Sequence, residues 1–313
     1  MRIFNLLAIS ILFSTGAAAA DGLQTGDVFS VGESGWAVMP ASGQWDGVAG
    51  QIGGPYVVYG GRAGYATSQD AVTWSRPIFA TNRRGDTLDV AEAAVAAGTV
   101  YLRLVDGTVT RADGGGARGV VAVGVSRLAP VGSGALVLES GRGLELAVRG
   151  VVTATVPNEQ LIAICGEVVV GSGGSVLSAG GGPVRKIAVR GQRAAGGGLM
   201  VITSAPATWR DDSAQSWRIE GGALKAIDSP GLRLTCWGAG APRGSGGGEW
   251  AGIGLVGGTE ICGEDARGSL KMITKLVPEL GSVRGLTSMG RDASGRLRVL
   301  VVGSAGIAQW RER

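Results

Sequence analysis

The sequence contains no histidine, and this absence removes several kinds of chemistry at once. Ser-His-Asp and Cys-His catalytic arrangements use an imidazole as general base. Histidine is also the commonest metal ligand and the side chain that titrates nearest neutral pH. Any catalysis would therefore rest on carboxylates, arginine, lysine or tyrosine. Because no complete catalytic set and no cofactor or metal motif takes its place, we predict a non-catalytic chain with no cofactor and no metal.

Cysteine is scarce, with three residues in the whole chain. There is no CxxC pair, so a zinc site or a thioredoxin-like site has no support. Cys236 and Cys262 both lie in strand-like runs, and a glycine-rich stretch between them can form a turn that brings the runs together. We therefore predict a disulfide between Cys236 and Cys262. Cys165 lies in LIAICGEVVV, where a small buried core residue is expected.

Aromatic residues (5%) and charged residues (17%) are also few, and the formal net charge is +4. The arginines are scattered along the sequence, whereas a nucleic-acid groove shows a basic stripe with interleaved aromatic side chains. We therefore expect a weakly basic solvated surface and no nucleic-acid partner. No later segment has the ~20 consecutive apolar residues that a membrane-spanning helix needs, so the mature chain is expected to have no membrane span.

The first twenty residues have the three parts of a secretory signal peptide. Arg2 supplies the positive start, Ile3–Phe13 is nearly all apolar, and Ala18–Ala20 provides small residues at a cleavage site. We predict a signal peptide over 1–20, cleaved near Ala20. The mature chain is then periplasmic or secreted, in a compartment where disulfides persist.

Glycine, by contrast, is abundant, with 58 residues that cluster between short β-branched runs. This arrangement is typical of strands joined by tight turns, because glycine takes positive φ without steric cost. A V-G-x-x-G motif recurs between pairs of strand-like runs, most clearly from Val31, Val170 and Val302. Together with weaker copies between them, the copies lie roughly thirty to fifty residues apart, a period found in propellers and solenoids.

The repeats predict an all-β fold, a single β-propeller domain over 21–313. Its blades are expected to be short four-stranded antiparallel sheets, seven in number, with six or eight as alternatives and a parallel β-helix as the main alternative fold. Small residues are expected to let the inner strands crowd together. Because the chain stops soon after the last V-G-x-x-G, we expect residues 26–31 to supply the outer strand of the last blade and close the ring.

Two units, VGESGWAVMPASGQW and VVVGSGGSVLSAGGG, resemble blades of the photosystem II assembly and stability factor-like propellers, within the wider Asp-box (BNR) repeat group. The Asp-box, S/T-x-D-x-G-x-T-W, is a hairpin turn in which the Asp binds backbone N–H groups and the Trp packs between blades. The segment TSQDAVTW keeps Thr67, Thr73 and Trp74, with Gln69 in the Asp place and Ala71 in the Gly place.

A second segment, RDDSAQSW, keeps Asp212, Ser216 and Trp217 of the same box. In this group the box is structural, so the resemblance implies turns and no active site. It also implies a role in assembling other proteins, because the photosystem-type relatives are assembly factors.

We therefore predict an exported, non-catalytic propeller that serves as a protein-binding or complex-assembly module for another envelope or secreted protein. One alternative is a lectin-like, glycan-binding propeller, in which exposed tryptophans stack on sugars. A second alternative is a sialidase-like glycosidase, since Asp-box propellers include sialidases. Its arginine clamp would draw on Arg76, Arg83 or Arg84 and its nucleophile on one of the four tyrosines, although none of these lies in a matching sequence context.

Overall fold

The computed structural model describes residues 29–31, 35–40, 45–61, 64–81, 84–112, 117–132, 134–186, 189–193, 199–204, 216–220, 223–227, 234–238, 243–247, 249–265 and 270–313. The predicted signal peptide 1–20 lies outside these residues. Among the described residues, no helix is long and apolar enough to span a membrane.

The described secondary structure is almost entirely antiparallel strand, in sheets that follow one another along the chain. The first sheet comprises β3 (Gly47–Gly50), β4 (Tyr56–Gly60) and β5 (Gly64–Ser68), followed by the short pair β6 (Ala80–Thr81) and β7 (Thr87–Leu88). The second comprises β8 (Val90–Ala96), β9 (Thr99–Leu104), β10 (Val109–Ala112) and β11 (Ala117–Ala122). The third comprises β12 (Val125–Val131), β13 (Ala135–Ser140), β14 (Gly143–Val148) and β15 (Val151–Pro157).

The middle of the chain is less regular. β16 (Leu161–Cys165), β17 (Val168–Gly171), β18 (Ser175–Ser178) and β19 (Arg185–Lys186) share one seven-stranded sheet with β20 (Val189–Arg193), β21 (Leu199–Ser204) and β24 (Leu234–Gly238). β22 (Ser216–Glu220) and β23 (Ala223–Ile227) form a separate hairpin. Because one sheet here holds the strands that two blades would need, the count of seven blades stays a prediction.

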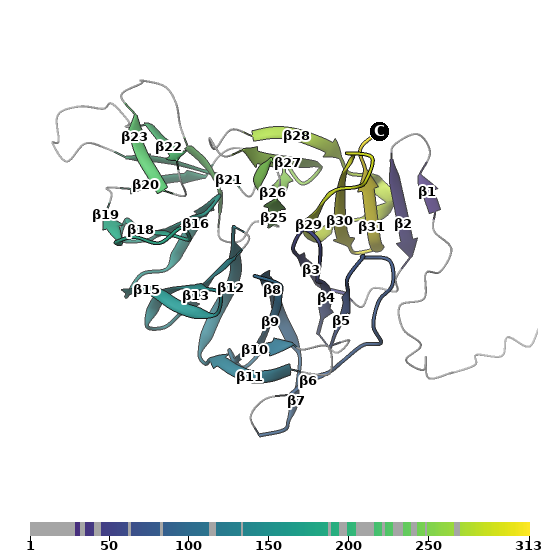
Figure 1. The fold of residues 1–313 in the computed structure, drawn as a ribbon, viewed down its shortest axis with the longest axis horizontal. Coiled ribbons are helices and arrows are strands. Elements are labelled where there is room, and N and C mark those ends of the chain that lie inside the picture. Colours follow the sequence, from purple (N-terminus) through teal and green to yellow (C-terminus); the bar gives the residue numbers. More distant parts are fainter. Residues whose placement is uncertain are drawn as a thin grey trace, which may run out of the picture.

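A four-stranded sheet follows, with β25 (Arg243–Gly247), β26 (Trp250–Val256), β27 (Glu260–Asp265) and β28 (Leu270–Lys275). After the 3-10 turn η2 (Pro278–Leu280) come β29 (Val283–Arg291), β30 (Leu297–Gly303) and β31 (Gly306–Arg311). Figure 1 shows the sheets arranged around a centre, with β3, β8, β25 and β29 innermost. The contacts of β29 with β3, of β3 with β8 and of β8 with β12 agree with this arrangement. The fold is therefore a β-propeller, as predicted.

The last sheet joins the two ends of the chain in the order β1-β2-β31-β30-β29. β2 (Trp36–Pro40) pairs antiparallel with β31, so that Trp36 lies opposite Trp310. β1 (Phe29–Val31) adds a fifth strand outside β2. An N-terminal strand therefore closes the ring, but the prediction that residues 26–31 supply it was wrong by one strand. Val31, where one V-G-x-x-G copy begins, ends β1, and Trp36, directly after the last glycine of that copy, begins β2.

Glycines let the innermost strands approach one another closely, as the sequence predicted. A Cβ atom at Gly244 of β25 would overlap the carbonyl oxygen of Leu286 on β29. A Cβ atom at Gly285 of β29 would lie 2.7 Å from the backbone nitrogen of Val48 on β3. Any larger residue at either position would push neighbouring sheets apart at the centre of the ring.

Carboxylates link some neighbouring sheets outside their apolar cores. Oε2 of Glu92 on β8 accepts a hydrogen bond from the backbone N–H of Leu128 on β12 at 2.7 Å. The same oxygen lies 2.7 Å from Nε of Arg103. Oε2 of Glu139 on β13 accepts from the backbone N–H of Leu161, the first residue of β16, at 3.1 Å. These hydrogen bonds hold the second sheet against the third and the third sheet against the one that follows it.

Candidate binding pocket

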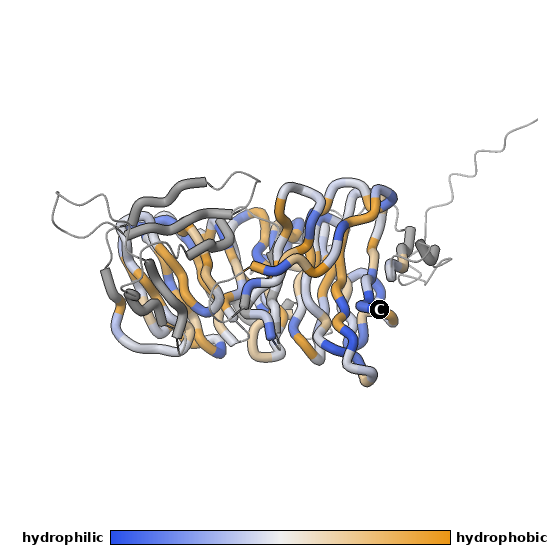
Figure 2. The backbone as a smooth tube through the Cα atoms, turned by 90° about the horizontal axis from the view of Figure 1, so that it is seen from above, coloured by the Kyte–Doolittle hydropathy of each residue, from blue (hydrophilic) through white to orange (hydrophobic). Residues whose placement is uncertain are grey.

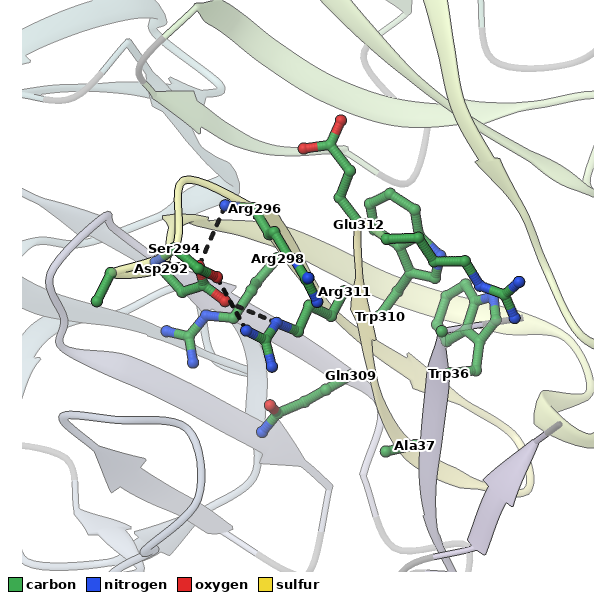
Figure 3. A pocket seen from close by; sticks show the side chains of 13 residues that line it. Trp36, Ala37, Asp292, Ser294, Arg296, Arg298, Gln309, Trp310, Arg311 and Glu312 are labelled. Atoms are coloured by element: carbon green, nitrogen blue, oxygen red, sulfur yellow. Dashed lines mark hydrogen bonds and ion pairs between the residues drawn. The ribbon is translucent and has the colours of Figure 1, made fainter. Parts of the chain in front are cut away.

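A pocket of about 650 Å³ opens at one end of the sheet that closes the ring. It is bordered by the loop between β29 and β30, the end of β31 and the start of β2 (Figure 3). Its lining residues are Gly35, Trp36, Ala37, Asp292, Ala293, Ser294, Arg296, Arg298, Gln309, Trp310, Arg311, Glu312 and Arg313. We call this the arginine pocket, because arginine is the commonest residue in that lining.

Strand pairing brings the arginines together. β30 and β31 are adjacent antiparallel strands, and Arg298 lies directly opposite Arg311 in their register. Arg296 lies directly before β30 and Arg313 lies two residues after the end of β31, and both belong to the same lining. Two acidic residues, Asp292 and Glu312, belong to the same lining. Arginines therefore outnumber carboxylate side chains in the pocket.

Those two carboxylates already have partners. Oδ2 of Asp292 forms an ion pair with Nε of Arg311 at 2.7 Å (Figure 3). Oε2 of Glu312 lies 2.7 Å from Arg291 and also accepts a hydrogen bond from the backbone N–H of Leu297 at 3.0 Å. Both carboxylates thus neutralise arginines other than Arg296 and Arg298.

Arg298 lacks a full set of partners. Its Nε is buried, yet it has no hydrogen-bond acceptor among the described residues. No acidic residue in the described part of the chain forms an ion pair with Arg296 or Arg298. A guanidinium carries five N–H donors in a planar fork that fits a carboxylate in a bidentate way. The arginine pocket is therefore suited to receive an anionic, planar group.

The loop that forms one wall of the arginine pocket is a tight turn organised by Asp292. Oδ1 of Asp292 accepts hydrogen bonds from the hydroxyl and N–H of Ser294, at 2.6 and 2.8 Å, and from the N–H of Arg296 at 3.1 Å. The Ser294 hydroxyl contributes most to lowering the pKa of Asp292 to about 2, with smaller effects from the two N–H groups and from Arg311. Asp292 thus remains ionised and fixes the backbone beneath Arg296.

Two tryptophans also belong to the lining of the arginine pocket. Trp36 is 2% exposed and Trp310 is 8% exposed, and both belong to an apolar core shared with Trp250 and Leu286. Nε1 of Trp36 donates a hydrogen bond to the carbonyl oxygen of Lys275 at 3.1 Å. Neither ring presents a free face to solvent, so these tryptophans support the site and leave recognition to the polar residues.

The first predicted Asp-box segment forms a tight turn, but its carboxylate comes from a different residue. Oδ1 of Asp70 accepts hydrogen bonds from the N–H groups of Val72 and Thr73 at 2.8 and 2.7 Å. Hydrogen bonds from Thr73 and then Val72 lower the pKa of Asp70 to about 2. Assigning the carboxylate position to Gln69 was wrong by one residue.

Other positions of this segment lie where the resemblance implied. Ala71 has a φ of +60°, the conformation expected in the Gly place. Trp74 is buried among residues of β4 and β30, between neighbouring sheets. The backbone of Thr67 exchanges hydrogen bonds with Ser75, which holds the two sides of the turn together. This turn touches the pocket-bearing sheet, because Nε2 of Gln309 donates to the carbonyl oxygen of Ala71 at 2.6 Å.

The second predicted Asp-box segment falls mostly beyond what the structure describes. Asp212 lies outside the described residues. Ser216 and Trp217 begin β22, where only the backbone is described. Their role as a structural turn stays a prediction.

The predicted Cys236–Cys262 disulfide is wrong, because Cys262 is a free, buried cysteine. Cys165 is buried in the core, as expected, and it is also disulfide-bonded. The backbone register explains the difference, since β16 pairs antiparallel with β24 so that Ile164 lies opposite Trp237. Continuing that register by one residue places residue 165 opposite residue 236. The pairing joins strands far apart in sequence, which the glycine-rich stretch between residues 236 and 262 gave no reason to expect.

The residues considered for a glycosidase are not brought together in the arginine pocket. Arg76 and Arg84 are exposed and line other parts of the surface, and Arg83 lies outside the described residues. Tyr56, Tyr65 and Tyr101 are buried. Burial, followed by the nearby charge of Glu92, raises the pKa of Tyr59 to about 12, which keeps its hydroxyl protonated. A nucleophilic tyrosine would need the opposite shift.

Sequence reasoning missed the arginine pocket, although a signal was present. The segments RDASGRLR and WRER each contain two arginines that are two residues apart, and the antiparallel pairing of their strands sets Arg298 opposite Arg311. Within the described residues, no group of three acidic or cysteine side chains is arranged to hold a metal ion.

No family model matches the sequence, and no curated protein matches it. Solved structures share its fold at low identity. The WD40 β-propeller domain of Doa1 is 11% identical with a TM-score of 0.43, covering 90% of this chain and 97% of that chain. YCF48 bound to D1 peptide is 10% identical with a TM-score of 0.43, covering 92% and 100%. A gluconolactonase from Xanthomonas campestris is 14% identical with a TM-score of 0.42, covering 91% and 93%. The likeness concerns the fold alone.

Proposed function

We propose that this chain is an exported, non-catalytic propeller that binds another envelope or secreted protein through the arginine pocket. The observation that carries the proposal is the pair Arg296 and Arg298, which lie in a concave site and form no ion pair with any described carboxylate. The backbone of Arg296 is held by Asp292 and that of Arg298 by its strand, so the positions of both residues are set before a ligand arrives. Preformed sites lose less conformational entropy on binding.

The chemistry of the pocket favours an acidic segment of a partner protein. An Asp, a Glu or a chain-terminal carboxylate can accept two parallel hydrogen bonds from one guanidinium. Arg311 is already paired with Asp292 at 2.7 Å, so it does not compete for the ligand. Arg298 forms no ion pair with a described carboxylate, so the terminal N–H groups of its guanidinium can donate to a ligand oxygen.

The glycan-binding alternative has less support. The tryptophans whose side chains are described, Trp36, Trp45, Trp74, Trp250 and Trp310, are all buried in apolar cores. Their burial favours a role in packing between strands over a role in stacking on sugars. An anionic polysaccharide would also present carboxylates to the arginine pocket. The experiment must therefore distinguish binding of a polysaccharide from binding of a protein.

Two further parts of the proposal concern origin and relatives. The signal-like residues 1–20 support export to the periplasm or the exterior. The Asp70 turn, with its carboxylate bound to N–H groups and its buried Trp74, supports descent from an Asp-box repeat shortened by one residue.

The test is a crosslinked affinity purification of the tagged mature protein from its native envelope fraction, read by mass spectrometry. The wild type is compared with an Arg296→Gln/Arg298→Gln double variant. The matched control is Arg142→Gln, an exposed arginine in the loop between β13 and β14, far from the pocket. Thermal unfolding of all three proteins confirms that they are equally folded.

We expect one or two stoichiometric protein partners with the wild type and with Arg142→Gln, and at least a tenfold loss with the double variant, about 1.4 kcal/mol. Retention of the same partners by the double variant would overturn the assignment of the pocket. Recovery of polysaccharide in place of protein would overturn the protein-binding proposal in favour of the glycan alternative.

A further inference from the structure

Strand alternation decides where two arginines of the pocket point. On β30, Arg298 shares a face with residues 300 and 302, and on β31, Arg311 shares a face with residues 307 and 309. That face packs against the first sheet, in a core that joins Leu300, Val302 and Ile307 to Tyr56, Val58 and Ala66. Figure 3 shows both arginine side chains pointing away from Trp36. Arg298 and Arg311 therefore lie at one end of the seam between the last sheet and the first.

Two loops of the first sheet border the same end of this seam. In the loop between β3 and β4, the Ile52 side chain lies over β29, since a Cβ atom at Gly290 would be 2.9 Å from Cγ2 of Ile52. In the Asp70 turn, the carbonyl oxygen of Ala71 accepts a hydrogen bond from Nε2 of Gln309 on β31 at 2.6 Å. Both loops therefore contact the sheet that carries the arginines.

Tyr56 lies between the β3–β4 loop and Arg298. Burial raises the pKa of Tyr56, whereas the charge of Arg298 and the backbone N–H groups of Gly54 and Gly53 act in the opposite direction. The guanidinium of Arg298 and the β3–β4 loop are thus both close to one buried hydroxyl. Ile52, which directly precedes Gly53, therefore lies near the Arg298 side of the pocket.

The two loops expose apolar side chains at this end of the seam. Ile52 is 38% exposed, and Val72, in the Asp70 turn, is 45% exposed. The carboxylate of Asp70 accepts a hydrogen bond from the N–H of Val72 at 2.8 Å, and its negative charge disfavours a second acidic group beside that valine. The surface thus has a positive part at Arg296 and Arg298 and an apolar part at Ile52 and Val72.

We infer that Ile52 and Val72 form one binding surface with the arginine pocket, and that this surface recognises a partner segment with an acidic residue and a large apolar residue close together. The inference rests on the proposed function, because the acidic residue is the one that Arg296 and Arg298 bind. A leucine, isoleucine or phenylalanine of the partner would cover the two apolar side chains and remove their surface from water. Ile52 and Val72 therefore determine which acidic segments bind.

A library of random peptides displayed on phage, selected on the mature chain, tests this specificity. Peptides enriched by the wild type should carry Asp or Glu together with Leu, Ile or Phe within a few residues. Selection on an Ile52→Ser/Val72→Thr double variant should keep the acidic preference and lose the apolar one. The matched control is Val105→Ser, an exposed valine between β9 and β10, which should select the same peptides as the wild type.

Fluorescence anisotropy with one enriched peptide gives the size of the effect. Replacing its apolar residue by alanine should weaken binding to the wild type about tenfold, and binding to the double variant by less than about twofold. Thermal unfolding checks that the variants fold, and Val72→Thr alone, which keeps the branched shape, replaces the double variant if that one does not fold.

The outcomes separate this inference from the proposed function. Acidic peptides enriched without an apolar preference would overturn the inference and leave the proposed function standing, as would equal weakening by alanine in the wild type and the Ile52→Ser/Val72→Thr variant. A selection that yields no acidic preference would overturn the proposed function, and this inference with it.

Discussion

Asp70 and Asp292 show how much of this fold depends on single carboxylates placed in turns. Each accepts backbone N–H groups two and three or four residues ahead, and each has a pKa lowered to about 2. The sequence pattern located the first turn but put its carboxylate at Gln69. In a degenerate motif, the residue that fills the Asp position is the one whose side chain reaches the backbone N–H groups of the turn. The amino-acid sequence alone does not show which side chain does so.

Asp70→Ala should destabilise the protein by about 1–2 kcal/mol, because two N–H groups lose a charged acceptor in an exposed turn. Gln69→Ala is the matched control, with an expected change within about 0.5 kcal/mol. Urea unfolding monitored by circular dichroism measures both. An equal cost for the two substitutions would contradict the assignment of Asp70 as the turn-forming residue.

The lowered pKa values of Asp70 and Asp292 predict a defined acid sensitivity. An unfolded Asp titrates near ~3.9, whereas both folded-state pKa values are about 2. The stabilisation is therefore fully present above pH ~4 and is lost as the pH falls toward 2. The urea midpoint should decline across this window, and more gently in Asp70→Asn, which cannot titrate. An unchanged pH dependence in Asp70→Asn would show that Asp70 contributes nothing to it.

At the scale of the strand, close packing at the centre of the ring leaves no space for side chains at some glycines. Gly285→Ala should cost about 1–3 kcal/mol, because its Cβ would lie 2.7 Å from the backbone of Val48 and would overpack the contact between β29 and β3. Gly141→Ala is the control, since a Cβ there meets no atom within 4 Å. Chemical denaturation measures both variants. A neutral Gly285→Ala would mean that the inner strands can separate easily.

The sequence predicted that the chain forms strands, but it did not predict which distant strands pair with each other. Runs bounded by glycine predicted the all-β fold, and the V-G-x-x-G copy from Val302 lies at the turn between β30 and β31. The disulfide was wrong because β16 pairs with β24 across about seventy residues of sequence, as non-local pairing in sheets allows. The pocket arginines were missed for the same reason, since only the pairing of β30 with β31 sets Arg298 opposite Arg311.

At the scale of the whole molecule, Trp36 ties the closing strand to the rest of the ring. It packs in a core with Ile253, Ile261 and Leu286 and donates a hydrogen bond to Lys275. Trp36→Ala should cost about 3–5 kcal/mol. Thermal unfolding of this variant, compared with a chain lacking only residues 29–31, separates ring closure by β2 from the added strand β1. A larger loss from removing β1 would contradict the assignment of β2 as the closing strand.

Ring closure by β2 and β31 also sets the order in which a newly made chain can mature. β2, which completes the last sheet, is synthesised before β3 to β30, whereas its partner β31 is synthesised after them. Until β31 exists, the early strand has no place to dock, and the growing chain exposes unpaired edges that attract chaperones or other chains. A chain truncated before β31 therefore leaves β2 without its partner and exposes unpaired strand edges. Such exposed edges distinguish a truncated chain from one in which the ring is closed.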